Sequence, residues 1–222
     1  MGGFLNISEE TEIFSIRILS YIMIIMAVLT FISLTRKRAA YGRYYQDKTV
    51  PGSDILVNAK LAWVVQEFPS FAVAVYFAFF TEAREFTHSA NKIILILFIF
   101  HYFQRTFIYS FLIRGGKPTP VFPFVLACIF CSYNGYIQGR YHSQYASYPG
   151  NYTSNINFIF GTVLCIAGMV INIHSDHVLR NLRKPGETGY KIPRGKNFFL
   201  DITSKKNILN IMTLLIISFY AY

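Results

Sequence analysis

The chain has 222 residues, a net charge of +10 at pH 7, and a composition that is 53% hydrophobic and only 14% charged. A soluble domain carries about 25% charged residues, so this composition argues against a soluble protein and indicates several membrane spans. Nucleic acid is not expected as a partner, because the basic residues flank apolar runs and form no continuous face.

The apolar runs predict an all-α fold, a polytopic transmembrane helical bundle. A helix needs roughly 20 residues to cross a bilayer, and five runs have about this length, while a sixth at the end of the chain is shorter. In chain order the predicted spans are 13–34, 61–80, 93–113, 121–138 and 156–174, followed by the short run 208–222.

The distribution of Lys and Arg predicts the orientation in the membrane. Cations concentrate in the segments 35–60, 114–120 and 177–207. Cytoplasmic loops carry the excess of Lys and Arg, so these segments are predicted to be cytosolic and the N-terminus to be lumenal. The opposite segments, predicted as lumenal loops, are 81–92 and 139–155, and their only cations are Arg84, Lys92 and Arg140.

The second span contains an ionisable residue, Glu67, within the run Gln66-Glu67-Phe68-Pro69. Such residues inside a membrane are expensive and are functional candidates by default. A carboxyl kept neutral in hydrocarbon can donate a hydrogen bond to a carbonyl oxygen. Pro69 cannot donate to Val65, so we expect a kink or a local opening beside the acid. The alternative is that Glu67 pairs with Arg105 as a structural link, and the two interpretations can coexist.

The third span carries Tyr102, Arg105 and Tyr109 at i, i+3 and i+7, which places them on one face of an α-helix. A Tyr102 hydroxyl near Glu67 would complete a pair of donors for one oxygen. The alternative for Tyr102 is an aromatic packing residue. Arg105 is expected to orient the acid, and the neighbouring His101 to hydrogen-bond between helices.

The segment 168–195 begins apolar and ends basic. Asn172, Asp176 and Arg183 follow at i, i+4 and i+11, within about 40° of one another on a helix face. Asn172 and Asp176 could hydrogen-bond an amide, ribose or adenine group, and the cations that follow could hold phosphates. The alternative is an ordinary basic rim on the cytosolic side.

No metal or redox site is predicted. His174, Asp176 and His177 lie close in sequence, but no further cluster of ligands supports a metal ion. The three cysteines lie inside apolar runs and are expected to pack there: Cys128, Cys131 and Cys165.

Four segments closely resemble the steroid 5α-reductases (3-oxo-5α-steroid 4-dehydrogenases), and the type 1 isoenzymes most of all. They are AWVVQEFPSF (62–71), HYFQRTFIYSFLIRGGKPTP (101–120), NGYIQGRY (134–141) and GMVINIHSDHVLRNLRKPGETGYKIPRG (168–195). The resemblance implies an oxidoreductase of the endoplasmic reticulum membrane. It also implies NADPH as the cofactor, and hydride transfer to C5 of a 3-oxo-Δ4-steroid such as testosterone or progesterone, with a proton added at C4.

The resemblance also implies roles for individual residues. Glu67 and Tyr102 match the catalytic pair that binds and polarises the steroid 3-carbonyl, and Trp63 and Gln66 match the lining of the steroid pocket. Enolate charge builds on the carbonyl oxygen during hydride transfer, so donors placed there lower the barrier. The cofactor-binding residues implied by the resemblance are Asn172, Asp176, Arg183, Tyr190, Arg105 and Arg114.

After Gly195 the sequence departs from the family pattern. We therefore expect an incomplete reductase-like membrane domain over 1–195 and a divergent tail over 196–222, from a splice or read-through event. Loss of one wall of the cofactor site predicts weak NADPH binding. Two alternatives stay open: a non-catalytic membrane protein that associates with a full-length enzyme, and a related enoyl- or polyprenol-type reductase.

Overall fold

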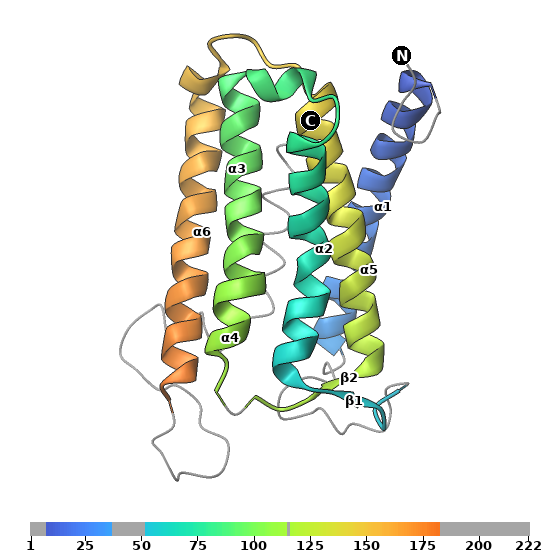
Figure 1. The fold of residues 1–222 in the computed structure, drawn as a ribbon, viewed down its shortest axis with the longest axis vertical. Coiled ribbons are helices and arrows are strands. Elements are labelled where there is room, and N and C mark those ends of the chain that lie inside the picture. Colours follow the sequence, from blue (N-terminus) through green and yellow to red (C-terminus); the bar gives the residue numbers. More distant parts are fainter. Residues whose placement is uncertain (1–7, 37–51, 115, 183–222) are drawn as a thin grey trace.

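A computed structural model describes residues 8–36, 52–114 and 116–182, and over these residues the chain is a bundle of long helices (Figure 1). Five of the described helices are long and apolar enough to cross a membrane: Glu9–Ser33, Ala59–Phe79, Ser89–Leu112, Val121–Tyr145 and Ile156–Arg180. The five predicted spans are therefore confirmed as helices of spanning length. The short run 208–222 lies outside the described residues.

The long helices follow one another as an up-and-down bundle. The α-helices are α1 (Glu9–Arg36), α2 (Ala59–Phe79), α3 (Ser89–Phe103), α4 (Ser110–Leu112), α5 (Val121–Arg140) and α6 (Ile156–Arg180). The strands are β1 (Leu56–Val57) and β2 (Thr119–Pro120). Two 3₁₀ turns, η2 (Arg84–Thr87) and η5 (Tyr152–Ser154), and two π-helical turns, η3 (Gln104–Tyr109) and η4 (Tyr141–Tyr145), complete the order.

The starts of α2 and α5 are held together by the antiparallel pair β1–β2, with Leu56 opposite Pro120. Val121, the first residue of α5, donates its N–H to the carbonyl of Ile55 at 2.8 Å. The first turn of α2 is capped by Asn58, whose side chain accepts from the backbone N–H groups of Lys60 and Leu61. These contacts fix the two helices side by side at one end of the bundle.

Two glycines of α5 let this helix approach α2 closely. A Cβ placed on Gly135 would lie 2.9 Å from the Cα of Ser70, and one on Gly139 would lie 2.9 Å from the Cα of Ala74. Any side chain at these positions would push the helices apart. The close approach therefore sets the spacing between polar groups of α2 and α5 that face each other.

One buried cluster lies between α2, α3 and α5, and its residues are Ala74, Ala78, Leu95, Phe98, Tyr102 and Cys131. Large apolar side chains such as Phe14, Leu29, Phe111, Ile129 and Phe160 are exposed on the outside of the bundle. An outward apolar surface of this kind suits contact with lipid. The fold is thus an all-α membrane bundle, as predicted.

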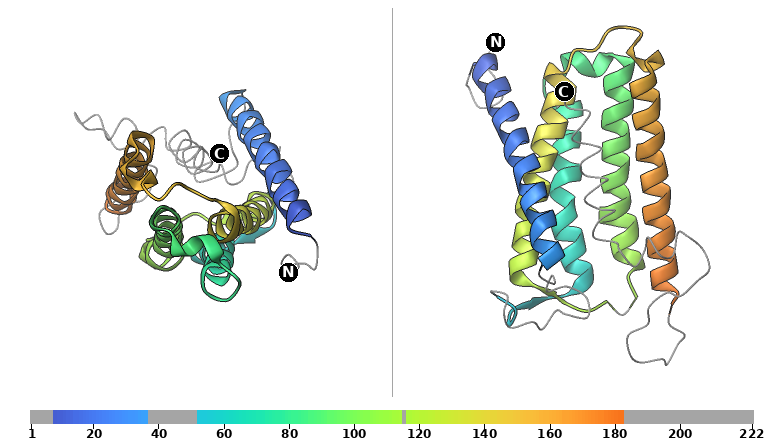
Figure 2. Two further views of the ribbon diagram at one scale, coloured as in Figure 1. Left: turned by 90° about the horizontal axis from the view of Figure 1, so that it is seen from above. Right: turned by 180° about the vertical axis from the view of Figure 1, so that it is seen from behind.

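Helices α1 and α6 lie at opposite edges of the bundle, α1 against α5 and α6 beside α3 (Figures 1 and 2). The end of α1, the start of α2 and the end of α6 lie at the same end of the bundle. We call this the cation-rich end, because the chain segments attached to it are those in which Lys and Arg concentrate.

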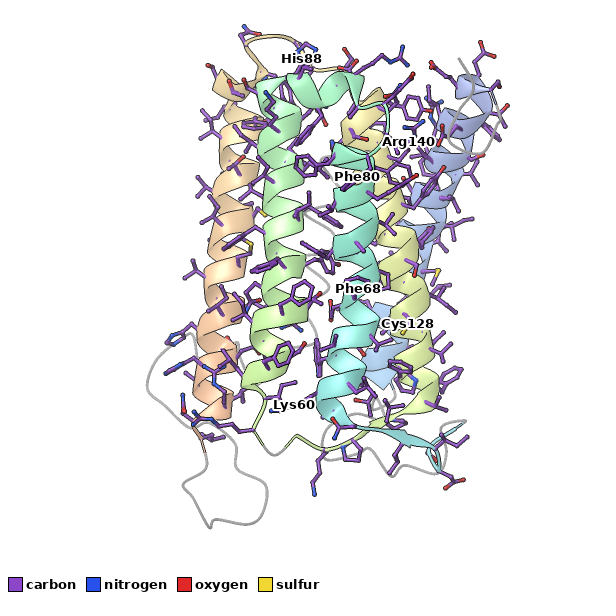
Figure 3. The ribbon with its side chains drawn as sticks, in the orientation of Figure 1. Lys60, Phe68, Phe80, His88, Cys128 and Arg140 are labelled. Carbon is purple, nitrogen blue, oxygen red and sulfur yellow. The ribbon has the colours of Figure 1, made fainter. Side chains whose placement is uncertain are left out.

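The sequence predicted that Arg140 lies in a loop, but the structure places it in a helix. It is the last residue of α5, is only 4% exposed, and its Nε lies 3.0 Å from Oε1 of Glu12 on α1. Figure 3 places it toward the end of the bundle opposite Lys60. A cation can stay inside the helical region here because a carboxylate from another helix neutralises it. The prediction of a loop position for Arg140 was wrong.

Helix α2 runs without interruption through Pro69. An irregular turn occurs instead in the third span, where η3 interrupts the α-helical hydrogen bonding over Gln104–Tyr109. A π-helical turn inserts extra backbone and is frequent at functional sites. The α-helical spacing assumed for Tyr102, Arg105 and Tyr109 therefore does not hold.

Candidate active site

The acid predicted from the second span lies inside the bundle, in a polar environment. Glu67 is in α2, about 12 Å along the helix from Ala59 at the usual rise per residue, and its side chain is 13% exposed. The Gln66 amide donates to Glu67 Oε1 at 3.4 Å, and the Cys131 thiol lies 3.9 Å from Oε2. Both carboxyl oxygens therefore have polar neighbours, one on α2 and one on α5.

Tyr102 reaches the same region from α3. It is 3% exposed and packs in the core cluster that also contains Cys131, the residue whose thiol neighbours Glu67. Its hydroxyl oxygen accepts a hydrogen bond from the Asn134 amide at 2.9 Å. His101 lies edge-on to the Tyr102 ring, with 5.2 Å between centroids. The structure thus brings the two predicted donors to one side of α5.

Arg105 sits at the centre of the predicted residues. Its guanidinium lies 3.9 Å from Glu67 and 3.0 Å from Asp176, and the residue is 4% exposed. The Cζ atom is 4.4 Å from the ring centroid of Trp63 and 4.5 Å from that of Tyr109. A buried guanidinium is stabilised by flanking aromatic faces as well as by carboxylates. The predicted pairing of Glu67 with Arg105 is confirmed, and Arg105 extends it to α6.

The polar stripe of α6 is described only in part. Asp176 is 3% exposed, and the Oδ1 atom of Asn172 is buried without a hydrogen-bond partner among the described residues. Helix α6 ends at Arg180. Arg183 and Tyr190 lie outside the described residues. The predicted shared helix face can therefore be examined only for Asn172 and Asp176. Arg114 is described and is exposed after α4.

Three residues that the sequence did not single out as site residues lie around Glu67 and Tyr102. Asn134 hydrogen-bonds Tyr102, Cys131 neighbours Glu67, and the Ser70 hydroxyl donates to the Cys131 carbonyl at 2.8 Å. The sequence feature that could have indicated Asn134 as a site residue is its polar side chain within an apolar span. Cys131 is buried, as predicted, and it also borders the acid.

This arrangement gathers a carboxyl from α2, a phenol from α3 and polar groups of α6 inside the bundle. The Tyr102 hydroxyl can donate a hydrogen bond, and the Glu67 carboxyl can donate one when it is protonated. Trp63 adds an aromatic face beside Arg105, and the Oδ1 atom of Asn172 is a buried acceptor. Within the described residues no group of three or more His, Cys, Asp and Glu side chains could hold a metal ion. The geometry is that of an acid–phenol pair beside an ion-pair network.

Comparison with known proteins identifies the family. The model of the 3-oxo-5-alpha-steroid 4-dehydrogenase family matches residues 117–219. The chain is 47% identical to the bovine (Bos taurus) 3-oxo-5-alpha-steroid 4-dehydrogenase 1, over 86% of this chain and 73% of that protein. The chain belongs to this family.

Other relatives agree. The chain is 43% identical to the human (Homo sapiens) 3-oxo-5-alpha-steroid 4-dehydrogenase 1, over 81% of this chain and 68% of that protein. It is 44% identical to the rat (Rattus norvegicus) type 2 enzyme, over 76% of this chain and 65% of that protein. The relatives are named as oxidoreductases of steroids, so the chain is a member of an enzyme family. The family match extends past Gly195, and the divergence of 196–222 stays a prediction.

Proposed function

We propose that the chain reduces the 4,5 double bond of 3-oxo-Δ4-steroids such as testosterone and progesterone, with NADPH as the reductant. The observation that supports the proposal is the placement of Glu67 and the buried Tyr102 inside one bundle, with Glu67 joined through Arg105 to Asp176, in a chain of the 3-oxo-5-alpha-steroid 4-dehydrogenase family. The overall change adds a hydride at C5 and a proton at C4 and gives the 5α-reduced ketone.

The chemical task of Glu67 and Tyr102 is to hold the 3-oxygen of the steroid. When a hydride adds at C5, negative charge moves through the enone to this oxygen. A neutral Glu67 carboxyl and the Tyr102 hydroxyl both donate hydrogen bonds there, in a site that water does not reach easily. Donors fixed before the reaction stabilise the developing enolate without reorganisation, and one such donor is worth about 10²–10³ in rate.

Arg105 helps to hold the Glu67 side chain in place. Its guanidinium is held by Asp176 at 3.0 Å and stands 3.9 Å from Glu67, so it restrains the carboxyl side chain without a short ion pair to it. Trp63 stacks against the same guanidinium and continues the apolar wall along α2. With Gln66, this wall would line the steroid pocket.

The described residues fit a dinucleotide at the cation-rich end. The Oδ1 atom of Asn172 is a buried acceptor without a described partner, and such an atom calls for a donor from a ligand. Asp176 is the next polar residue along this helix face. The residues that would hold NADPH are Asn172, Asp176, Arg105, Arg114, Arg183 and Tyr190. When bound, the reduced nicotinamide supplies the hydride.

We also propose that the protein lies in the endoplasmic reticulum membrane with its N-terminus in the lumen. The support is the distribution of cations, because the segments rich in Lys and Arg attach to one end of the bundle. The proposed cofactor residues are at this end, so the site would open to cytosolic NADPH. Steroids partition into lipid and can enter from the bilayer.

The test is a product analysis in membranes that contain the chain. Testosterone or progesterone is supplied with NADPH, and the expected product is the 5α-reduced 3-ketone, two mass units heavier. Glu67→Ala and Tyr102→Phe are each expected to lower kcat about 10²–10³-fold, whereas Glu10→Gln, at an exposed residue of α1, should not change it. Failure of the unsubstituted chain to form the product overturns the proposal, and so does full activity in both site variants. Reduction of a non-steroidal enone in preference to the steroids would favour the related enoyl reductases instead.

A further inference from the structure

We infer that Asn134 is a positioning residue that sets the direction of the Tyr102 hydroxyl proton. The inference rests on the proposed function, because it concerns the donor that Tyr102 would offer to the steroid carbonyl. Asn134 lies on α5 and Tyr102 on α3, and the two are 2% and 3% exposed. Neither side chain can exchange its partner for bulk water, so their mutual orientation is fixed by the protein.

The direction of the Asn134–Tyr102 hydrogen bond is what matters. The amide nitrogen of Asn134 lies 2.9 Å from the phenolic oxygen of Tyr102. An amide N–H₂ group can only donate, whereas a phenol has one proton to donate and lone pairs that accept. Asn134 therefore occupies a lone pair of Tyr102 and leaves the phenolic proton for another acceptor.

Ser70 on α2 uses its own proton elsewhere. Its hydroxyl donates to the Cys131 carbonyl at 2.8 Å, so it does not compete as a donor for a ligand oxygen. The phenolic proton of Tyr102, which Asn134 does not engage, is available to a strong acceptor such as a polarised carbonyl oxygen.

The backbone holds Asn134 in place. Gly135 follows Asn134 directly, and it brings α5 so close to α2 that a Cβ there would lie 2.9 Å from the Cα of Ser70. Asn134 is thus held at a tight contact between two helices while its amide reaches Tyr102 on α3. A phenol that is directed in this way loses no rotational freedom when it donates to a ligand, which is the advantage of preorganised donors.

Substitution of Asn134 by Asp reverses the direction of the hydrogen bond to Tyr102 with little change in side-chain shape. A carboxylate only accepts hydrogen bonds, so Tyr102 would donate to residue 134 and would no longer donate to a ligand. Protonation of the new carboxyl would restore a donor, so the effect should grow as the pH rises. Asn134→Ala removes the hydrogen bond that directs the Tyr102 hydroxyl but supplies no competing acceptor. Its effect on the bound carbonyl should therefore lie between those of the unsubstituted chain and Asn134→Asp.

The test reads the carbonyl of a bound steroid directly and needs no turnover. Testosterone labelled with ¹³C at C3 is bound to the purified chain in detergent, and its carbonyl resonance is compared with that of the free steroid. Hydrogen bonds to the oxygen move this resonance downfield. Tyr102→Phe should remove part of the shift and weaken binding about fivefold, the usual worth of one hydrogen bond. Asn134→Asp should do the same, and the double variant should lose no more than either single variant.

Asn91→Asp is the matched control. Asn91 is fully buried, and its amide donates to the carbonyls of His142 and Ala146, remote in the bundle from Glu67 and Tyr102. This substitution also replaces a buried amide donor by a carboxyl group, but it should leave the carbonyl resonance of bound steroid unchanged.

The possible outcomes separate the two proposals. If the unsubstituted chain gives no downfield shift, the proposed function fails and the inference fails with it. If the shift is present and depends on Tyr102 but survives Asn134→Asp, only the inference is overturned. Additive losses in the double variant also overturn it, because Asn134 would then act independently of Tyr102. A loss that is shared by both variants and absent in Asn91→Asp supports it.

Discussion

Arg105 and Asp176 form a buried ion pair, with 3.0 Å between Nη1 and Oδ2, that joins α6 to the third span. Helix α6 lies at the edge of the bundle and exposes much apolar surface, so this pair is an important internal link between α6 and the other helices. Because Arg105 also neighbours Glu67, the same side chain connects the residues proposed for the cofactor with those proposed for the steroid.

The first prediction concerns the strength of this ion pair. Arg105→Met removes the guanidinium that neutralises the buried Asp176 carboxylate, and Asp176→Asn leaves the guanidinium with the more distant Glu67 carboxylate at 3.9 Å. Breaking a buried pair from one side costs about 3–5 kcal/mol. Each single variant should therefore unfold at a clearly lower temperature in detergent, as measured by circular dichroism.

The double variant Arg105→Met with Asp176→Leu tests the origin of that cost. An apolar pair of similar volume is often as stable as the ion pair that it replaces, so the double variant should regain most of the lost Tm. It should not regain steroid reduction, because Glu67 loses its restraint. A double variant less stable than both single variants would mean that packing, and not the unpaired charge, explains the losses.

The second prediction concerns the contact between α2 and α5. Gly135→Ala places a methyl group 2.9 Å from the Cα of Ser70, and overpacking of this kind costs about 1–3 kcal/mol. Because Ser70 is one turn from Glu67, the substitution should lower activity as well as Tm. Gly150→Ala is the matched control, since its Cβ would meet nothing within 4 Å. Equal effects of the two substitutions in a thermal unfolding assay would contradict the prediction.

The sequence predicts the spans because each is a long apolar run whose ends are marked by charge or by turn residues. The pairing of Glu67 with Arg105 could be named from the sequence as an alternative role for the acid, because an acid and a base buried in neighbouring spans are far more stable together than apart. The match of several segments to one family supplied the expected roles. These features depend on residue type and on order along the chain.

The contacts that sequence reasoning missed depend on how the helices are rotated against one another. Asn134 could face any neighbour of α5, and only the packed structure shows that it faces Tyr102 on α3. Arg140 was assigned to a loop because a lone cation at the end of a run looks solvated, whereas Glu12 from α1 meets it inside the bundle. The π-helical turn that contains Arg105 has no signal in residue periodicity.

The third prediction compares two ion pairs near the start of α1. Glu12 is fully buried. Its carboxylate accepts hydrogen bonds from Nε and Nη2 of Arg140 at 3.0 and 3.1 Å. It also accepts hydrogen bonds from the hydroxyl groups of Tyr136, at 3.2 Å, and Tyr145. Arg140→Met removes the charged partner of the buried Glu12 carboxylate and leaves it only neutral donors, which should cost about 3 kcal/mol. The expected readout is a lower Tm together with faster labelling of a cysteine introduced at Ile16, which is buried between α1 and α5.

The exposed pair of Arg84 with Glu9 is the control for this prediction. Its atoms are just as close, at 2.9 Å, and the neighbouring carboxylate raises the pKa of Arg84. Both side chains are nevertheless solvated, and exposed ion pairs contribute little to stability. Arg84→Met should leave both Tm and labelling unchanged. A loss equal to that of Arg140→Met would show that α1 is attached through surface charge and not through the buried cluster.

The fourth prediction uses Trp63 as an internal reporter, because it is the only tryptophan in the sequence. Its ring lies 4.4 Å from the Arg105 guanidinium and is one helical turn from Glu67. A steroid held by Glu67 and Tyr102 would exclude water from the indole and shift its emission to shorter wavelength. Titration with testosterone, excited at 295 nm to avoid tyrosine, should give a saturable shift whose midpoint equals the Kd from equilibrium binding of labelled steroid.

Two variants make this emission signal specific. Arg105→Met should change the emission of the ligand-free chain, because the cation leaves the indole face, while Arg84→Met should not. Glu67→Ala should move the midpoint of the titration to higher steroid concentration without changing the emission at saturation, since Trp63 and the wall beside it remain. A steroid that binds by the radiolabel assay and leaves Trp63 emission unchanged would place the binding site elsewhere in the bundle, away from α2 and Arg105.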